Sequence, residues 1–309
     1  MFPNFLGIGA QKAGTTWLYA NLRLHPQIWM PPIKELHFLD CGRTPLAQRL
    51  FSDAKRLKKA RSYLREQIWG LPAGGRLGEV AWALRYCLAP RTDAWYRSLF
   101  PEIPGKMTGE ISPGYAKLRG EAVGRIHRLM PDAKVIYLLR NPIERSWSYA
   151  VQHFANARWK GRYGSVDDVA EQELLAFLTM DRSEGHSDYL GALAAWERHY
   201  GQNQLFVGFF DELTTNPRAL LKGVLDFLGV DSGDDVTPAT VRKNPNPGRG
   251  VTIPSELQAY LIRLHHDQLV GLHAKFNNSW TSAWLASAEM AFAADHPPWR
   301  AGQSARDRH

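Results

Sequence analysis

The sequence predicts an α/β fold, a single domain with a parallel sheet flanked by helices, and two observations support this class. Three short apolar runs, at 5–9, 135–139 and 205–210, have the length and composition of strands buried on both faces. Each run lies next to a stretch with helical periodicity, which is the alternation expected where helices connect parallel strands. A further strand is expected at 107–111, before a turn rich in Pro and Gly.

Helices are expected at three places. The first covers 15–24 and ends before a His-Pro pair. The second covers 144–154, directly after the second apolar run. The third covers 217–228, introduced by an Asn-Pro pair and closed by Gly229 in the position of a helix C-cap.

No internal repeat or linker divides the chain, so we expect one domain over 1–296 and a flexible, polar tail at 297–309. The basic, amphipathic stretch at 50–70 is expected to form a solvated helix face.

The two cysteines, Cys41 and Cys87, are too few for a disulfide framework and indicate reducing surroundings. Neither a signal-peptide pattern nor a bilayer-spanning apolar run is found, so the sequence predicts a cytoplasmic protein without integral membrane association. The oligomeric state is left open.

The charge balance favours an anionic ligand. The chain has 38 Lys and Arg residues against 30 Asp and Glu residues, a formal charge of +8. Nucleic acid, an anionic membrane surface and a polyphosphorylated nucleotide would all suit such a surplus, and so would a general requirement for solubility. Charge alone does not choose among them.

The segment 5–17 (FLGIGAQKAGTTW) carries the strongest functional signal. A strand leads into a glycine-containing turn and then a helix, which presents backbone N–H groups and a positive dipole end to a phosphate. Gly9 and Gly14 have the spacing of a P-loop, but Thr15 stands where nucleotide triphosphatases have lysine. The lysine lies inside the turn as Lys12, where it can reach a bridging oxygen. A P-loop-like sheet is therefore expected, and a glycine turn capped by threonine is the plain alternative.

The second strand ends in a cation. Where a Walker B strand ends in a carboxylate that helps to hold magnesium, the run at 135–139 is followed by Arg140. An arginine at that place suits an anion, so the chemistry is expected to need no metal.

Two segments resemble motifs of the sulfotransferases that use 3'-phosphoadenosine 5'-phosphosulfate (PAPS). Residues 11–17 (QKAGTTW) are similar to that family's 5'-phosphosulfate loop, and 140–149 (RNPIERSWSY) to its 3'-phosphate motif, which pairs an Arg with a Ser eight residues later. The resemblance implies the sulfotransferase fold and PAPS as cosubstrate. The basic loop that closes over the 3'-phosphate in the family would correspond to 242–244 (RKN). The implied donor-binding residues are Lys12, Ala13, Gly14, Thr15, Thr16, Trp17, Arg140, Ser148, Arg242 and Lys243.

A finer resemblance is to the heparan-sulfate and glycan branch of that family. Residues 34–40 (KELHFLD) are similar to the segment that carries the branch's catalytic glutamate, and 109–115 (GEISPGY) to a segment that borders the acceptor. Ile111 replaces the usual lysine of the second segment, which puts one anion contact to the acceptor in doubt. A carbohydrate, a glycolipid or a secondary metabolite with a hydroxyl or amine is the acceptor that this likeness implies.

The same resemblance assigns roles. Glu35 is implied as the general base and Lys12 as the stabiliser of the leaving oxygen. His37 is a rival base or a partner of Glu35, since other sulfotransferases use a histidine and its unperturbed pKa suits proton transfer near neutrality. Contacts to the sulfate or acceptor are expected from Lys34, Tyr115 and Tyr189. Each of these residues also has a plain alternative. Glu35 would be an exposed carboxylate, His37 a structural histidine and Lys34 a surface lysine, and the two tyrosines would be half-buried side chains without a role.

Three other functions fit the sequence less well than a sulfotransferase does. An ATP-dependent small-molecule kinase with a variant P-loop is disfavoured by Thr15 and Arg140, which replace a lysine and a carboxylate. A non-catalytic nucleotide-binding module is disfavoured by the segment 34–37, because binding alone needs no base. A nucleic-acid-binding protein is disfavoured because no module of that kind is recognisable.

Overall fold

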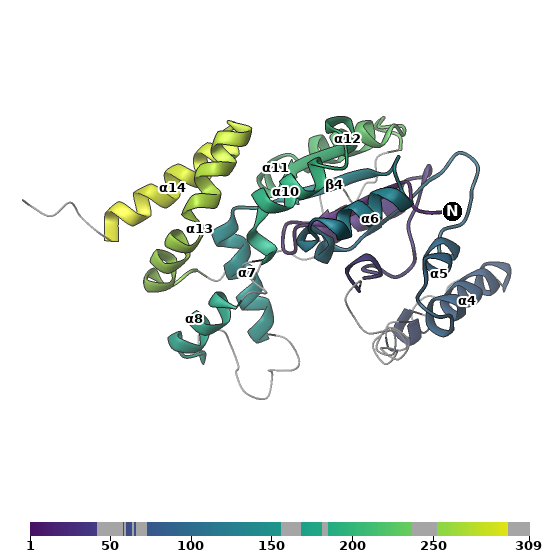
Figure 1. The fold of residues 1–309 in the computed structure, drawn as a ribbon, viewed down its shortest axis with the longest axis horizontal. Helices are drawn as coiled ribbons and strands as arrows, with labels where there is room; N and C mark the ends of the chain where they lie inside the picture. Colours follow the sequence, from purple (N-terminus) through teal and green to yellow (C-terminus); the bar gives the residue numbers. More distant parts are fainter. Residues whose placement is uncertain are drawn as a thin grey trace, which may run out of the picture. The chain divides into compact units, whose positions relative to one another are not determined.

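The computed structural model describes residues 1–41, 58, 60–63, 65, 73–155, 168–180, 185–236, 241 and 252–295. Within these residues the predicted α/β class and parallel sheet are confirmed (Figure 1). All strand pairs are parallel, and the spatial order is β2-β3-β1-β4-β5. The strands are β1 (Phe5–Gly9), β2 (Ile28–Trp29), β3 (Met107–Ile111), β4 (Lys134–Leu139) and β5 (Leu205–Phe209).

The helices follow the alternation that the sequence predicts. Predicted helices 15–24 and 217–228 have the same bounds in the structure, and the one at 144–154 begins two residues earlier, at Pro142, a residue suited to a first helical turn. The described α-helices are α1 (Thr15–Leu24), α4 (Ala73–Leu88), α5 (Asp93–Ser98), α6 (Glu121–Leu129), α7 (Pro142–Ala155), α8 (Glu171–Thr179), α10 (Tyr189–Glu197), α11 (Phe210–Thr215), α12 (Pro217–Leu228), α13 (Ser255–Phe276) and α14 (Ser279–Asp295). Short 3-10 turns occur at η1 (Leu39–Cys41), η3 (Pro113–Lys117) and η5 (Gln202–Gln204).

The chain divides into two compact units. The first comprises Met1–Arg140 with Gly191–Pro247 and contains the whole sheet; the second comprises Asn141–Leu190 with Gly248–His309 and is helical where it is described. The predicted domain end at 296 and the tail beyond it lie outside the described residues, so those bounds stay a prediction.

The sheet is buried because its strands are mostly apolar. All five residues of β1 are buried, as are the last five of β4. Gly109 in β3 leaves room for the ring of Phe5 on the neighbouring strand: a Cβ at Gly109 would lie 2.2 Å from that ring. The central strands are therefore fixed in register by side-chain packing as well as by backbone hydrogen bonds.

The second unit has a buried polar centre of its own. The guanidinium of Arg145 in α7 donates from Nε to Ser187 Oγ at 2.6 Å and from Nη2 to Ser146 Oγ at 2.8 Å. Ser146 Oγ also lies 2.9 Å from Nε2 of His265 in α13, which ties these two helices together. Helices α13 and α14 lie side by side (Figure 1), joined at Asn277, whose φ of 44° ends α13 in the left-handed conformation.

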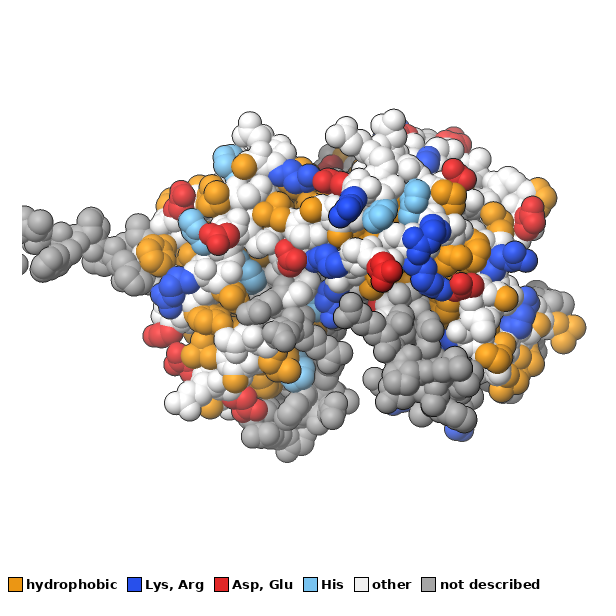
Figure 2. Space-filling view, viewed as in Figure 1, with side chains coloured by type: hydrophobic (Ala, Val, Ile, Leu, Met, Phe, Trp, Pro, Cys, Tyr) orange, Lys and Arg blue, Asp and Glu red, His pale blue; other side chains and the backbone are white. Residues whose placement is uncertain are grey.

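Two surface properties bear on the sequence-based expectations. Among the described helices, none has both the length and the apolar character that crossing a bilayer requires. On the face seen in Figure 2, Lys and Arg side chains are interspersed with Asp and Glu side chains rather than gathered in one stripe.

Candidate active site

The phosphate loop follows β1 and ends in α1. Lys12 and Gly14 adopt left-handed conformations, with φ of 72° and 89° respectively, and Gly14 caps the helix that begins at Thr15. A Cβ at Gly14 would lie 2.8 Å from Leu213 Cδ1 of α11, so both the conformation and the packing require glycine. The N–H groups of the first helical turn have no partner within the helix and face its end, which suits an anion.

Arg140 stands beside this loop, at the end of β4. Its Nη1 donates to the backbone oxygen of Lys12 at 3.3 Å, and its guanidinium carbon lies 4.5 Å from the centre of the Phe210 ring. The ends of the neighbouring parallel strands β1 and β4 bring Arg140, the first residue of the predicted 3'-phosphate motif, beside the phosphate loop. Ser148, the predicted partner of Arg140, is half-buried in α7 in the second unit, and its pairing with Arg140 stays a prediction.

Lys34 joins the phosphate loop to the predicted base. Its Nζ donates to Thr15 Oγ1 at 3.3 Å and to Thr16 Oγ1 at 3.0 Å, both in the first turn of α1. The same ammonium lies 3.1 Å from Glu35 Oε1. One cation therefore contacts both the hydroxyls that line the anion site and the carboxylate expected to move a proton.

Glu35, His37 and Asp40 form a line of ionisable side chains. His37 Nε2 lies 3.5 Å from Glu35 Oε2, and His37 Nδ1 lies 2.7 Å from Asp40 Oδ2. Burial by itself raises the pKa of Glu35, but the hydrogen bond from His37 and the charge of Lys34 outweigh it and lower this pKa to about 2. The hydrogen bond to Asp40, followed by the one to Glu35, raises the pKa of His37 to about 9. At neutral pH the carboxylate of Glu35 is ionised and the ring of His37 is protonated.

The 34–40 loop is held in a strained conformation by contacts from distant parts of the sequence. Glu35 and His37 have φ of 63° and 51°, a left-handed region that non-glycine residues rarely occupy without support. Arg91 Nη2 donates to the backbone oxygens of Leu36 at 2.9 Å and of His37 at 2.5 Å. The ring of Phe38 is stacked on Tyr96, with centroids 4.6 Å apart and planes 16° apart.

Beneath the loop lies a buried carboxylate that the sequence analysis did not single out. Glu110 in β3 is fully buried and accepts hydroxyl protons from Tyr96 at 2.5 Å, Ser112 at 2.8 Å and Tyr115 at 2.7 Å. Burial raises the pKa of Glu110, and the three hydroxyls oppose that rise. A carboxylate in a strand that is otherwise apolar was the signal in the sequence that could have identified it.

The two predicted acceptor contacts are not at a surface. Tyr115 and Tyr189 are both fully buried, and the hydroxyl of Tyr115 is bonded to Glu110 instead. Both side chains lie inside the protein in this structure, and contact of either tyrosine with an acceptor stays a prediction. Ile111, which stands in place of the family's lysine, is also buried, and a Cβ at Gly7 would lie 2.6 Å from its Cγ1. That position therefore offers no cation to an acceptor.

The other residues predicted to bind PAPS are in part buried and in part outside the described residues. Ala13 and Trp17 are buried, and the indole Nε1 of Trp17 donates to the backbone oxygen of Val241 at 2.9 Å. Trp17 thus fixes the start of α1 from inside the unit. Arg242 and Lys243 lie outside the described residues. Asp40, which was quoted within its motif but given no role, is the residue that the geometry adds to the site.

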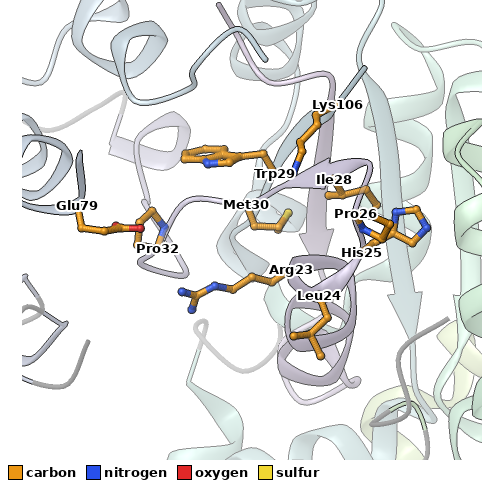
Figure 3. A pocket seen from close by; sticks show the side chains of 10 residues that line it. All are labelled: Arg23, Leu24, His25, Pro26, Ile28, Trp29, Met30, Pro32, Glu79 and Lys106. Atoms are coloured by element: carbon orange, nitrogen blue, oxygen red, sulfur yellow. The ribbon is translucent and has the colours of Figure 1, made fainter. Parts of the chain in front are cut away.

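A surface cavity of about 300 Å³ lies elsewhere on the first unit (Figure 3). Arg23 comes from the last turn of α1, Lys106 precedes β3 and Glu79 belongs to α4. Those residues of the predicted site that the structure describes do not line this cavity, which lies beside the edge strand β2. Within the described ranges, no group of three or more His, Cys, Asp or Glu side chains is arranged to hold a metal ion.

Comparison with known proteins identifies the relationship. A family model described as the sulfotransferase family matches residues 3–235. Human heparan sulfate glucosamine 3-O-sulfotransferase 6 is 27% identical over 239 residues, which are 74% of this chain and 53% of the relative. Mouse heparan sulfate glucosamine 3-O-sulfotransferase 3B1 is 31% identical over 239 residues, 74% of this chain and 46% of the relative. The chain thus spans about half the length of these curated relatives.

A solved structure shows the same fold. The crystal structure of a sulfotransferase from Alicyclobacillus acidocaldarius matches with a TM-score of 0.63 and 24% identity, over 92% of this chain and 99% of that one. The family model covers the phosphate loop, the 34–40 loop and every strand of the sheet. The chain is an enzyme that belongs to the sulfotransferase family.

Proposed function

We propose that the chain transfers a sulfuryl group from PAPS to a hydroxyl or amine of a carbohydrate. The observation that carries this proposal is the position of Lys34, whose ammonium contacts Thr15 and Thr16 of the phosphate loop and the carboxylate of Glu35. Transfer of a sulfuryl group from an anionic donor to a hydroxyl requires an anion site close to a proton acceptor. Here one cation contacts both.

The residues of the loop fit the anionic end of such a donor. The start of α1 offers backbone N–H groups, Thr15 and Thr16 offer hydroxyls, and Arg140 stands beside the loop. The donor supplies the sulfuryl group and leaves as adenosine 3',5'-bisphosphate (PAP). Lys12 is proposed to stabilise the charge that develops on the leaving oxygen, and Arg140 to bind the 3'-phosphate.

Glu35 is the proposed general base, and His37 its partner. With its pKa near 9, His37 is protonated at neutral pH and has no free lone pair to accept a proton. Glu35 is ionised and can accept one, although a pKa near 2 makes it a weak base. When Lys34 turns from Glu35 to a sulfate oxygen, one of the charges that lower the pKa of Glu35 is withdrawn. Its basicity then rises in the complex that needs it.

The acceptor is proposed from the relatives. Two of them are named for transfer to a glucosamine hydroxyl of heparan sulfate, so a glucosamine-containing glycan is the first candidate. The buried Ile111 removes one cation that the glycan branch has beside its acceptor. A glycan with fewer anionic groups than heparan sulfate is therefore the better expectation.

The test combines donor binding and transfer. Calorimetry should show that PAP binds without magnesium and that ATP with magnesium does not compete. Label from [35S]PAPS should appear in one of a panel of sugars, phenols, lipids and amines that includes heparan sulfate and its desulfated form. Glu35→Gln should reduce turnover about 10²–10⁴-fold and leave PAP affinity unchanged. Full turnover by this variant would remove Glu35 as base, and preference for ATP with magnesium would overturn the donor assignment.

A further inference from the structure

The 34–40 loop depends on hydroxyl groups that a buried carboxylate orients. The backbone N–H of His37 donates to Ser112 Oγ at 3.4 Å. The backbone N–H groups of Phe38 and Leu39 donate to the hydroxyl oxygen of Tyr115 at 3.1 and 3.4 Å. These hydroxyls lie more than seventy positions away along the chain, at the end of β3 and in η3.

Each of the two hydroxyls has one proton, and Glu110 accepts it. Ser112 donates to Oε2 and Tyr115 to Oε1, at 2.8 and 2.7 Å. Backbone N–H groups of the loop donate to both hydroxyl oxygens, so the hydroxyl protons point away from the loop and toward the oxygens of Glu110. Because all three groups are buried, water does not offer these hydroxyls another orientation.

We propose that Glu110 is a positioning residue for catalysis: through Ser112 and Tyr115 it holds the backbone of residues 37–39, and thereby keeps Glu35 and His37 in their left-handed conformations. It touches neither donor nor acceptor. The inference rests on the proposed function in one respect, because it takes Glu35 and His37 as the residues whose positions matter for proton transfer.

Tyr96 provides a matched control. Its hydroxyl donates to the same oxygen of Glu110 as that of Tyr115, at 2.5 Å, but Tyr96 contacts the loop with its ring, stacked on Phe38, and not with its hydroxyl. Both tyrosines are fully buried. Phenylalanine at either position keeps the ring and removes one hydrogen bond to Glu110. Only Tyr115→Phe also removes the hydroxyl oxygen that accepts from the backbone N–H groups of Phe38 and Leu39.

Amide hydrogen exchange measures the loop directly and needs no acceptor molecule. Tyr115→Phe should speed exchange at Phe38 and Leu39 about tenfold, the factor that one lost hydrogen bond represents, whereas Tyr96→Phe should change these amides less than about twofold. Ser112→Ala should speed the amide of His37, and Ser112→Thr should restore it. Thermal denaturation reports whether each variant is folded.

Turnover supplies the second measurement. With [35S]PAPS and heparan sulfate, or whichever glycan the panel identifies, Tyr115→Phe should lose at least about tenfold in kcat with PAP affinity unchanged, and Tyr96→Phe should lose less. Equal effects of the two variants on the 37–39 amides would overturn the proposal, because Glu110 would then only stabilise the core. If no glycan accepts sulfate, the acceptor assignment fails, and amide exchange in Glu110→Gln still decides the role of Glu110. This variant keeps the shape of the side chain and should speed exchange at the 37–39 amides as Tyr115→Phe does; unchanged exchange would overturn the proposal.

Discussion

His37 lies between two carboxylates, and removing either one should lower its pKa by an amount that the distances set. Its Nδ1 is 2.7 Å from Asp40 Oδ2 and its Nε2 is 3.5 Å from Glu35 Oε2. Because the side chain is 42% exposed, the dielectric constant of water is the appropriate screening. The attraction is then about 1.5 kcal/mol for Asp40 and about 1.2 kcal/mol for Glu35.

Since about 1.4 kcal/mol moves a pKa by one, Asp40→Asn should lower the pKa of His37 from about 9 to about 8. Glu35→Gln should lower it by slightly less. With both carboxylates replaced, the two losses together are about 2.7 kcal/mol, so the pKa should fall by about two, from about 9 to about 7. The sign follows from the raised pKa: the positive charge of His37 is present below about 9 and is lost as the pH rises through that value.

Proton NMR titration of the histidine Cε1–H resonances measures these values, and the spectrum of His37→Gln identifies the resonance. Glu121→Gln, which removes an exposed carboxylate that is not among the groups acting on His37, is the control and should leave the titration unchanged. A wild-type His37 that titrates near 6.5 would refute the reasoning, as would an Asp40→Asn variant that titrates like the wild type. Either result would also return His37 to the position of a rival base.

Two more substitutions test the donor site. Gly14→Ala should lower stability by at least about 1–2 kcal/mol in thermal denaturation and weaken PAP binding in calorimetry, because φ is 89° and Leu213 Cδ1 would be 2.8 Å from the new Cβ. Gly105→Ala, with φ of 72° and open space around its Cβ, is the matched control and should leave PAP affinity unchanged. Arg140→Ala should weaken PAP binding at least about tenfold, the loss of one charge-assisted hydrogen bond, whereas Lys106→Ala, a cation at the separate cavity, should not. Equal losses from both cation variants would mean that only overall charge attracts the nucleotide.

The strands were predictable because burial on both faces leaves a continuous apolar run. The bounds of β1 and β3 agree with the prediction, and those of β4 and β5 differ by one residue at one end. The edge strand β2 was not predicted, since two residues carry no periodicity. Helices α13 and α14 were also missed, although α13 is the longest described helix. They bury apolar residues against each other, a pairing that neither segment shows by itself.

The site was predictable only in part, for a related reason. The phosphate loop and the 34–40 loop are local motifs, and the residues within each were found together. The supports of the 34–40 loop come from Arg91, Glu110, Ser112 and Tyr115, and no spacing in the sequence shows that these residues meet it. The bond between the hydroxyl of Tyr115 and Glu110 could not be predicted for the same reason. Whether an aromatic hydroxyl faces a cleft or a buried carboxylate depends on tertiary packing.

The arrangement around Lys34 gives a reason why Glu35, the base that we propose, can act with so low a pKa. In the free enzyme the ammonium neutralises Glu35 and contacts the hydroxyls of Thr15 and Thr16, so the charge of the base is compensated until a donor is present. A sulfate oxygen placed at those hydroxyls competes with Glu35 for the same cation. In the mechanism that we propose, occupation of the anion site therefore frees the carboxylate when an acceptor hydroxyl has a sulfuryl group to attack. His37 still donates to Glu35 from a ring fixed by Asp40, and this contact keeps the freed carboxylate in place.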